Sequence, residues 1–315
     1  MKASVGERVV SQGGERSVTE KRGRRTGHQR VTPYLYVLPA LLFVGGFLYY
    51  GIGFNINISG YEWNGLSANR TPVGLDNYRR LLTDTIFLKA FGNTMLFAVL
   101  TIPLQMYLAL RLATLLSAPI RFRGFFQAVI ILPSITAPAI VALVARRVFD
   151  ARAGEMNALL DLVGLDGLQQ AWLANPSTVL FALMVAHVWQ WTGFGYILYY
   201  SALSLVGREV IESATIDGAS NRQMFWRIVV PLVKPTHWAL AILGVIQTLK
   251  LFEIVYLTTR GGPGRASEVV STFLFKAGLL DLQAGYSAAV AVVVVIVSLA
   301  LTVAQFAVYN RSRLT

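Results

Sequence analysis

Long apolar stretches, separated by shorter polar ones, make up most of the chain. A helix needs about 20 apolar residues to cross the ~30 Å hydrocarbon core of a bilayer, and six stretches reach that length. They cover about 34–58, 90–112, 124–146, 178–205, 237–259 and 284–310. The fifth differs from the others because Lys250 and Glu253 lie inside it. The pattern predicts an all-α polytopic membrane protein with six transmembrane helices in a single domain, residues 34–310.

The basic residues indicate how these helices are oriented. The chain has 28 Lys and Arg against 16 Asp and Glu, a net charge of +12. Most of the Lys and Arg lie in the polar segments 1–30, 111–123, 208–234 and 311–315. Because cytoplasmic loops of membrane proteins are enriched in Lys and Arg, we expect these segments, and both termini, on the cytoplasmic side. The positive charge then reflects topology, and no nucleic-acid partner is expected.

Residues 1–33 form a basic, Gly-rich tail without apolar periodicity, which we expect to be cytoplasmic and disordered. The apolar run that follows is long enough to span, so a cleaved signal peptide is not indicated. The tail either stays solvated and reinforces the orientation, or binds anionic lipid through the basic cluster at 21–25. Residues 311–315 form a short cytoplasmic end.

The amino-acid composition and the motifs that are absent exclude several classes of chemistry. The chain has no Cys and only 3 His, so a disulfide, a thiolate nucleophile or a Cys-ligated or multi-His metal site is not expected. No Gly-Lys dipeptide occurs, so the chain lacks the GxxxxGK[ST] phosphate-binding loop. HExxH and GxSxG motifs are absent as well. We therefore expect no catalytic residue, metal or bound cofactor on this chain.

The polar segment 208–237 has the pattern of a structured helix–turn–helix rather than of a free loop. A short helix with a small-residue face is expected to end at Gly218, because Gly adopts the left-handed conformation at low cost. A second amphipathic helix follows, with Met224, Phe225, Ile228 and Val229 on one side. We expect Pro231 and Pro235 to stop it. A structured cytoplasmic element of this kind indicates that another protein docks on it.

This segment resembles the EAA loop of binding-protein-dependent ABC importer permeases. The matching residues are Glu212-Ser213-Ala214, Asp217-Gly218-Ala219, Phe225, Ile228, Pro231 and Pro235. Ser213 stands where the family pattern has its first Ala, and both residues are small. The resemblance extends from about Tyr34 to Asn310 and is closest to the carbohydrate-uptake branch, the maltose- and glycerol-phosphate-type permeases. Further matching segments are Gly74–Tyr78, Asn93-Thr94, Leu132-Pro133, Trp189-Gln190, Gly193-Phe194, Phe252–Tyr256, Gly261–Pro263 and Gly285–Ala289.

The resemblance implies a type I ABC importer-like transmembrane domain in a bacterial inner membrane. A second homologous permease would form a heterodimer with this chain, two ATPase subunits would bind ATP and Mg, and an extracytoplasmic binding protein would deliver a sugar-like solute. The helix over 212–218 would be the coupling helix that docks on one ATPase. The implied ATPase-coupling residues are Glu212, Ser213, Ala214, Asp217, Gly218, Ala219, Phe225 and Pro231. Glu212 could instead cap its helix or pair with Arg208.

Ionisable residues inside a membrane helix usually face protein or water, which makes Lys250 and Glu253 candidates for a substrate cavity. Three residues apart, they would share a helix face and could pair. Polar and aromatic residues near them in the fifth and fourth spans suit a sugar, whose hydroxyls need hydrogen bonds and whose apolar faces stack on rings. The candidate cavity residues are Gln190, Trp191, Tyr196, Gln247, Lys250, Glu253 and Tyr256. A purely structural ion pair remains the alternative for Lys250 and Glu253.

The main alternative function is a secondary transporter driven by an ion gradient. Such a carrier often contains inverted repeats with matching broken helices, and the two halves of this sequence show no clear repeat. A stand-alone carrier also has no need of a structured docking segment. A membrane scaffold without transport would leave the two intramembrane charges unexplained.

Overall fold

The computed structural model describes residues 27–206 and 208–314. The chain separates into two compact units, Met1–Ile52 and Gly53–Thr315, which are described one at a time. The first contains helix α1 (Gly27–Val44) and the π-helical turn η1 (Gly45–Tyr49), and helix α2 (Tyr50–Ile58) continues from it into the second. Residues 1–26 of the predicted disordered tail lie outside the described residues, and residues 27–33, the rest of that tail, are helical. Extending an existing helix adds one backbone hydrogen bond for each residue that becomes ordered, whereas starting a new helix orders several residues for its first bond. Extension of α1 toward the N-terminus therefore costs little.

In the described part of the second unit, the regular elements are helices and one small hairpin, β1 (Tyr61–Glu62) and β2 (Thr71–Pro72), in which Tyr61 pairs with Pro72. The helices before residue 208 are α3 (Asp76–Thr83), α4 (Thr85–Ser117), α5 (Arg123–Ile135), α6 (Pro138–Val148), α7 (Glu155–Leu162), η2 (Asp166–Leu168) and α8 (Val179–Ser204). Those after it are α9 (Arg208–Ile216), α10 (Asn221–Gln223), η3 (Met224–Val229), α11 (Val230–Leu232), α12 (Lys234–Leu249), α13 (Glu253–Thr259), α14 (Val270–Phe275), η4 (Lys276–Leu280) and α15 (Ala284–Leu314).

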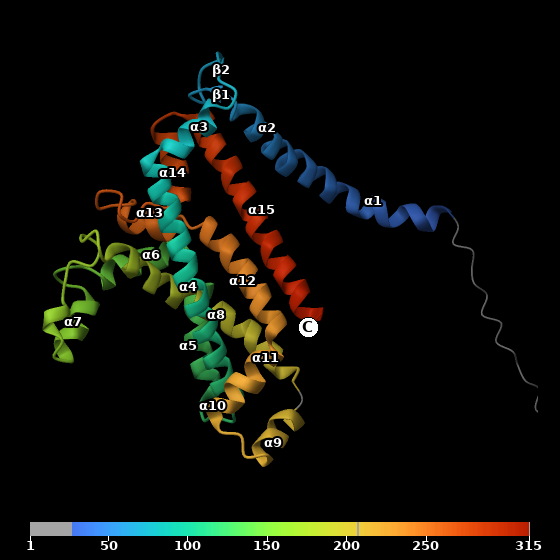
Figure 1. Cartoon of the computed structure of the whole chain (residues 1–315), viewed down its shortest axis with the longest axis vertical. Coiled ribbons are helices and arrows are strands. Elements are labelled where there is room, and N and C mark those ends of the chain that lie inside the picture. The colour runs from blue at the N-terminus through green and yellow to red at the C-terminus, as the bar shows by residue number, and fades with distance from the viewer. Residues whose placement is uncertain (1–26, 207, 315) are drawn as a thin grey trace, which may run out of the picture. The chain divides into compact units, whose positions relative to one another are not determined.

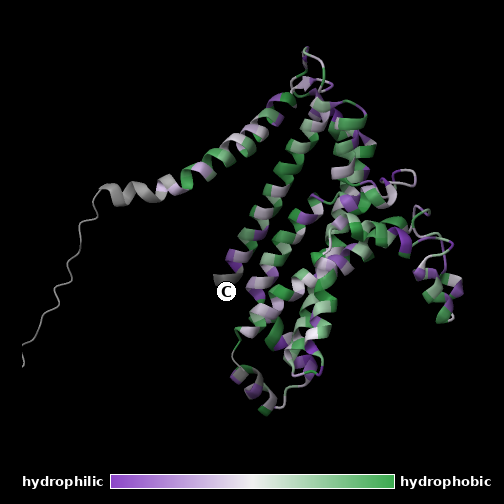
Figure 2. Ribbon diagram, turned by 180° about the vertical axis from the view of Figure 1, so that it is seen from behind, coloured by the Kyte–Doolittle hydropathy of each residue, from purple (hydrophilic) through white to green (hydrophobic). Residues whose placement is uncertain are grey.

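The long helices of this unit run between two ends that carry different segments. The hairpin, α3 and the start of α15 lie at one end, called here the hairpin end, and α9 and α10 lie at the other, called the 208 end (Figure 1). Polar residues gather toward these ends and around α7, whereas the long helices are hydrophobic over most of their length (Figure 2). This distribution is the one expected of helices that cross a hydrocarbon layer.

Helix α8 lies at the centre of the unit and packs against α4, α5, α6, α12 and α13. Glycines on α8 allow two of these contacts to be very close. A Cβ atom on Gly193 would lie 2.3 Å from the carbonyl oxygen of Ile130 on α5, and one on Gly195 would lie 2.9 Å from the Cβ of Ala109 on α4. Small residues at helix–helix contacts are typical of membrane proteins, where tight packing replaces the hydrophobic effect as the driving force.

The prediction of six spans is supported only in part. Three described helical segments are long and apolar enough to cross a membrane, Tyr36–Ile58, Thr85–Ser117 and Ala284–Arg311, and the number rises to five if two bent helix pairs each count as one span. The predicted fourth span coincides with α8, a continuous helix of 26 residues. Many of its side chains are buried against other helices, so α8 carries polar residues that a lipid-facing helix would exclude.

Two of the predicted spans are not continuous helices. In the third, α5 and α6 meet at an angle of 102°. Thr136 and Ala137, between them, have extended backbones (ψ 138° and 133°), as expected for Ala137 because the residue before a proline, here Pro138, avoids the helical region. The fifth predicted span breaks after Leu249 and resumes as α13 at Glu253. No Pro or Gly lies at this second break, between Leu249 and Glu253.

The hairpin end of α4 is joined to α3 and α15 through one carboxylate. Asp84 accepts hydrogen bonds from the backbone N–H groups of Ile86 and Phe87, as an N-cap, and from the hydroxyl of Tyr286 at 2.8 Å. The guanidinium of Arg80 lies 4.1 Å above the Tyr286 ring. Partial burial acts to raise the pKa of Asp84, but these hydrogen bonds outweigh it and the pKa lies below its usual value.

The close contact between α8 and α5 leads to the first prediction. Gly193→Ala places a methyl group against a backbone carbonyl that cannot move without shifting α5, so we expect a loss of about 1–3 kcal/mol in stability, as for other overpacked interiors. The measurement is the thermal unfolding midpoint of the purified protein in detergent. The matched control is Gly92→Ala on α4, where an added Cβ meets no atom within 4 Å. Equal unfolding midpoints for the two variants would contradict the packing argument.

Candidate functional site

A cavity of about 240 Å³ lies where the two broken helices, α5–α6 and α12–α13, meet α8. Five of the seven predicted cavity residues lie together on its wall, and these are Gln190, Trp191, Gln247, Lys250 and Glu253. The remaining lining residues are Pro138, His187, Ile246, Leu251 and Ile254. The structure therefore brings polar residues from three separate segments of the chain to one place.

Gln190 is held in the wall by the break between α5 and α6. Its side chain is buried, and its Nε2 donates to the carbonyl oxygen of Thr136 at 3.4 Å, a long hydrogen bond. Thr136 is the C-cap of α5, so this carbonyl has no partner within its own helix. The side chain of Gln190 thus supports the bent backbone from α8 and has one amide oxygen left to accept a further bond.

Lys250 and Glu253 reach the cavity from the two sides of the break in the fifth predicted span. Lys250 is the C-cap of α12 and Glu253 is the first residue of α13, so the prediction that they share the face of one helix is wrong. Both side chains are exposed. Within residues 27–206 and 208–314, neither takes part in an ion pair. Their charges are therefore open to the cavity instead of neutralising each other.

Two predicted residues lie outside this wall. Tyr196 is fully buried in the cluster formed by α4, α8 and α12, where its ring stacks on Tyr200 at a centroid distance of 5.7 Å. Tyr256 stacks on Phe252 at 5.0 Å and meets the edge of Phe275 at the same distance. Tyr196 packs inside the protein and Tyr256 is half-buried against Phe275 of α14, because the helix turns on which they lie face neighbouring helices. The spacing in the sequence does not reveal which helix a given turn faces.

His187 is a cavity residue that the sequence reasoning missed. It is buried on α8, with its ring against Phe97 at 5.1 Å, and its Nδ1 atom has no hydrogen-bond partner among the described residues. A polar group inside a membrane-spanning helix is by itself a sign of function. That signal was available from the sequence, since His187 is one of only 3 His and lies in the fourth apolar stretch.

The segment between Arg260 and Val269 is a rigid loop next to α13. Glu268 is completely buried, and its carboxylate accepts bonds from Lys276 Nζ at 2.5 Å and from the hydroxyl of Thr272 at 2.7 Å. Asn93 of α4 donates to the carbonyl oxygens of Ala266 and Glu268. These bonds fasten the loop to α4 and α14, and so hold the end of α13 in place.

In the 208–237 segment, α9 ends at Gly218 as predicted. Gly218 has φ +80°, the Ala219 N–H bonds to the Ala214 carbonyl, and the Gly218 N–H bonds to the Thr215 carbonyl. This is the Schellman arrangement, which favours Gly at its left-handed position. Among the predicted coupling residues, Ala214 and Phe225 are buried and Ala219 is half-buried. Five are exposed, namely Glu212, Ser213, Asp217, Gly218 and Pro231.

The second half of the segment is anchored in the helix bundle. Ser220 and Gln223 form a capping box that starts the helix. Phe225 and Val229 are buried against α4 and α8, and the Arg111 guanidinium lies 4.8 Å from the Phe225 ring. The helix ends at Leu232, between Pro231 and Pro235 as predicted, and α12 starts at Lys234 at an angle of 71° to it.

The family follows from comparison with known proteins. The family model of the binding-protein-dependent transport system inner membrane components matches residues 108–314. The chain belongs to this family. The expectation of a transport subunit, with ATP hydrolysis on a separate subunit, is thereby confirmed, and the ion-gradient alternative is set aside.

Relatives of this permease are similar over nearly their whole length. A probable ABC transporter permease protein, YurN of Bacillus subtilis, is 34% identical over 286 residues, which cover 90% of this chain and 98% of YurN. The lactose transport system permease protein LacF of Rhizobium radiobacter is 30% identical, covering 91% and 97%. The sn-glycerol-3-phosphate transport system permease protein UgpA of Agrobacterium fabrum is 28% identical, covering 88% and 94%.

Solved structures show the same fold. A chain of a bacterial ABC transporter involved in the import of the acidic polysaccharide alginate superposes with a TM-score of 0.77 at 23% identity, covering 90% of this permease and 96% of that chain. A bacterial alginate ABC transporter in complex with an alginate pentasaccharide-bound periplasmic protein gives a TM-score of 0.73 at 23% identity, covering 88% and 93%. The arrangement of helices described above is therefore that of an ABC importer permease.

The two carboxylates of the site region have opposite surroundings, which leads to a stability prediction. Glu268→Gln removes the charge partner of the half-buried Lys276, which keeps its bond to the Arg260 carbonyl, and breaking a buried pair costs about 3–5 kcal/mol. Glu253→Gln alters an exposed group without an ion pair, so its effect should stay within about 0.5 kcal/mol. The measurement is the thermal unfolding midpoint of each variant in detergent. A large loss for Glu253→Gln would show that its charge has a structural partner.

Proposed function

We propose that this permease forms, with a second homologous permease, the translocation path of an importer for a sugar or sugar-like solute. The observation that carries the proposal is the cavity wall, where unpaired charges, amide groups and an indole ring come together. An extracytoplasmic binding protein would deliver the solute, and two ATPase subunits, which bind ATP and Mg, would drive the cycle. The membrane is the bacterial inner membrane, with the 208 end and both termini cytoplasmic.

The chemistry of the cavity supports a polyhydroxylated cargo. Lys250 donates hydrogen bonds, Glu253 accepts them, and the amides of Gln190 and Gln247 do both. Trp191 offers a ring on which the apolar face of a sugar can stack. Such a mixture of a few polar groups and apolar surface is typical of small-molecule sites. The names of relatives point the same way, since LacF is a lactose permease and UgpA serves glycerol phosphate.

The balance of charge narrows the expected cargo. With one cation and one anion in the wall, a neutral sugar can bond both groups, whereas an acidic sugar would meet the repulsion of Glu253. A neutral cargo is therefore the better fit to this cavity.

The geometry of α9 supports a docking role on the ATPase. The helical segment that follows α9, η3, is buried against α4 and α8 through Phe225 and Val229. A force applied to α9 would therefore be transmitted to α4 and α8 through these two side chains. The tip of α9 exposes an apolar side chain, Ile216, at 86%. An exposed apolar residue beside the acidic Glu212 and Asp217, at a cytoplasmic position, suits a groove on a partner protein. Ala219 follows Gly218 in the turn at this tip and Pro231 lies farther along the chain, and both would act by shaping the segment.

The docking role predicts a specific defect for Gly218→Asp. The substitution adds a charged side chain at the exposed turn, so the complex should assemble while uptake per ATP hydrolysed falls at least tenfold. The measurement is uptake and ATPase activity together, in proteoliposomes containing the complete transporter.

The matched control for this variant is Gly164→Asp. Gly164 has φ +72° and ends α7 with the same pair of backbone hydrogen bonds, between residues 164 and 161 and between 165 and 160. It lies far from the 208 end along the chain, so its substitution should leave coupling intact. Equal uptake per ATP in wild type and Gly218→Asp would contradict the docking role.

The cavity assignment predicts a change in cargo preference for Glu253→Gln. Removing the anion should raise the KM for neutral sugars several-fold and reduce the discrimination against acidic ones. The measurement is concentration-dependent uptake over a panel of neutral and acidic sugars, with the exposed Asp281→Asn as control. A fall in protein abundance with unaltered KM would indicate a structural role instead.

The partners are tested by mass spectrometry of the complex purified from its native membrane in mild detergent. An ATPase and a second permease in stoichiometric amounts are the expected result. A homodimer without an ATPase would contradict the proposal.

A further inference from the structure

A second, much narrower cavity of about 20 Å³ adjoins the first between α4, α8 and α12. The walls of the two cavities share Trp191 and Gln247. The wall of the narrow cavity is otherwise mainly apolar, and its other lining residues are Ile102, Gln105, Met106, Phe194, Gly195, Leu240, Leu243 and Gly244. We call it the inner cavity, and the larger one the outer cavity.

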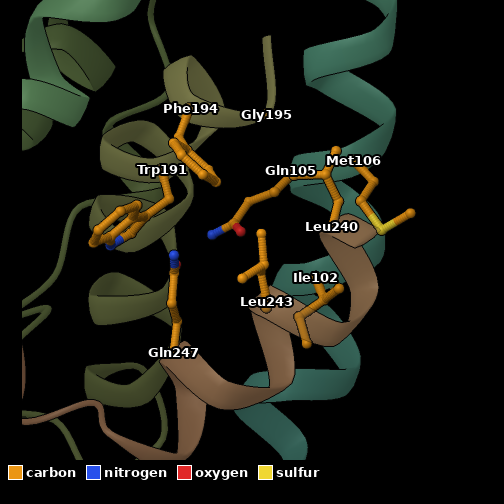
Figure 3. Close-up of a pocket in the computed structure, with 10 residues that line it drawn as sticks. Ile102, Gln105, Met106, Trp191, Phe194, Gly195, Leu240, Leu243 and Gln247 are labelled. Carbon is orange, nitrogen blue, oxygen red and sulfur yellow. The ribbon is translucent and has the colours of Figure 1, made fainter. Parts of the chain in front are cut away.

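Gln105 is the polar residue that α4 contributes to the inner cavity. Its amide and that of Gln247 both point into the space between the three helices, with the Trp191 ring on the α8 side (Figure 3). The hydrogen bond from Gln105 Nε2 to the His187 carbonyl is long, at 3.4 Å. An amide surrounded by apolar side chains is costly unless it finds partners, and here most of its bonding capacity is unused.

The inner cavity lies closer to the 208 end than the outer cavity does. Along α12, which starts at the 208 end, Leu240 and Leu243 come before Gln247, and Lys250 comes last. At 1.5 Å of rise per residue, Leu240 and Lys250 are about 15 Å apart along the axis. On α8, which runs the opposite way, His187 and Gln190 of the outer cavity precede Phe194 and Gly195 of the inner one. Two helices therefore give the same order.

Two glycines close the inner cavity in this conformation. Gly195 brings α8 onto α4, and at Gly244 an added Cβ on α12 would lie 3.0 Å from the Ile102 side chain of α4. A space of about 20 Å³ holds about one water molecule, so no sugar fits until α4 separates from α8 and α12.

We propose that the two cavities are successive parts of one translocation path and that Gln105 is the residue that hydrogen-bonds the cargo in the inner part. The inference rests on the proposed function, because it assumes that the outer cavity carries cargo. Beyond Trp191 and Gln247, a hydroxylated solute would enter the mainly apolar inner cavity. The Gln105 amide offers it a hydrogen-bond donor and an acceptor there. The inner part opens only when α4 parts from α8 and α12 during the transport cycle.

The absence of Cys from the chain permits a direct test with single cysteines. The variants are Lys250→Cys in the outer cavity, Gln105→Cys in the inner cavity, and Leu104→Cys as the matched control. Leu104 is the neighbour of Gln105 on α4, is 48% exposed and lies outside both cavities. The probe is the cationic, membrane-impermeant reagent 2-(trimethylammonium)ethyl methanethiosulfonate, applied to the complete transporter, with cysteine-free partner subunits, in lipid nanodiscs.

The reaction rate of each cysteine is compared between the nucleotide-free state and the state trapped with ATP and vanadate. We expect the rate at Gln105→Cys to differ at least tenfold between the two states, because the inner cavity opens in only one. Leu104→Cys, in lipid, should react slowly in both. Leu243→Cys, which lines the inner cavity from α12, should follow Gln105→Cys and serves if that variant does not assemble.

The outcomes separate this inference from the proposed function. If Lys250→Cys reacts while Gln105→Cys and Leu243→Cys are as slow as Leu104→Cys in both states, the inner path is wrong and the outer cavity stands. If Lys250→Cys is also unreactive in both states, the cavity does not lie on a water-accessible path, and the proposed function fails with it.

Discussion

A hydrocarbon layer offers no hydrogen bonds, so every backbone N–H and C=O group within it must find a partner in the protein. This permease breaks two helices at the level of its outer cavity, and side chains from neighbouring segments supply partners for the carbonyls next to the breaks. Gln190 bonds the Thr136 carbonyl at the first break, and Ser271 bonds the Leu251 carbonyl at the second. Thr258 joins the two broken helices directly through the Ala142 carbonyl.

The cavity follows from this arrangement. Non-helical backbone at membrane depth is tolerated where it is buried in protein or lines a water-filled space, and the breaks here do both. They turn α6 and α13 away from α5 and α12, and the space left at the bends is walled by Lys250, Glu253 and the polar face of α8. The residues that support the breaks and the residues that face the cavity are thus neighbours, or, for Gln190, the same residue.

The central position of α8 explains its composition. A helix that packs on five others does not need an apolar surface, and it can carry His187, Gln190 and Trp191 toward the cavity while Gly193 and Gly195 bring α5 and α4 close. At the 208 end the division of roles is just as clear. Phe225 and Val229 fasten the segment to the bundle, and the exposed tip around Ile216 and Gly218 is left for a partner.

The sequence alone determined the helical class, the positions of the continuous helices α4, α8 and α15, and the turn at Gly218, because these depend on local properties. Apolar length sets which segments form long helices in a membrane protein. A left-handed helix end favours glycine, as at Gly218, although α13 ends at Arg260 in the same conformation. Motif spacing also led to the family. Five residues of the cavity wall were predicted because polar groups within apolar stretches usually face protein or water rather than lipid.

Only the tertiary structure decided the rest. The break after Leu249, the packing of Tyr196 and Tyr256 against other rings, and the places of His187 and Gln105 all depend on contacts with helices distant in sequence. No Gly or Pro marks the break at 250–252, because it is stabilised by Ser271 and by the fit of α13 on α6 rather than by local preference. Periodicity tells which residues share a helix face, but which neighbour that face meets is settled only when the helices pack.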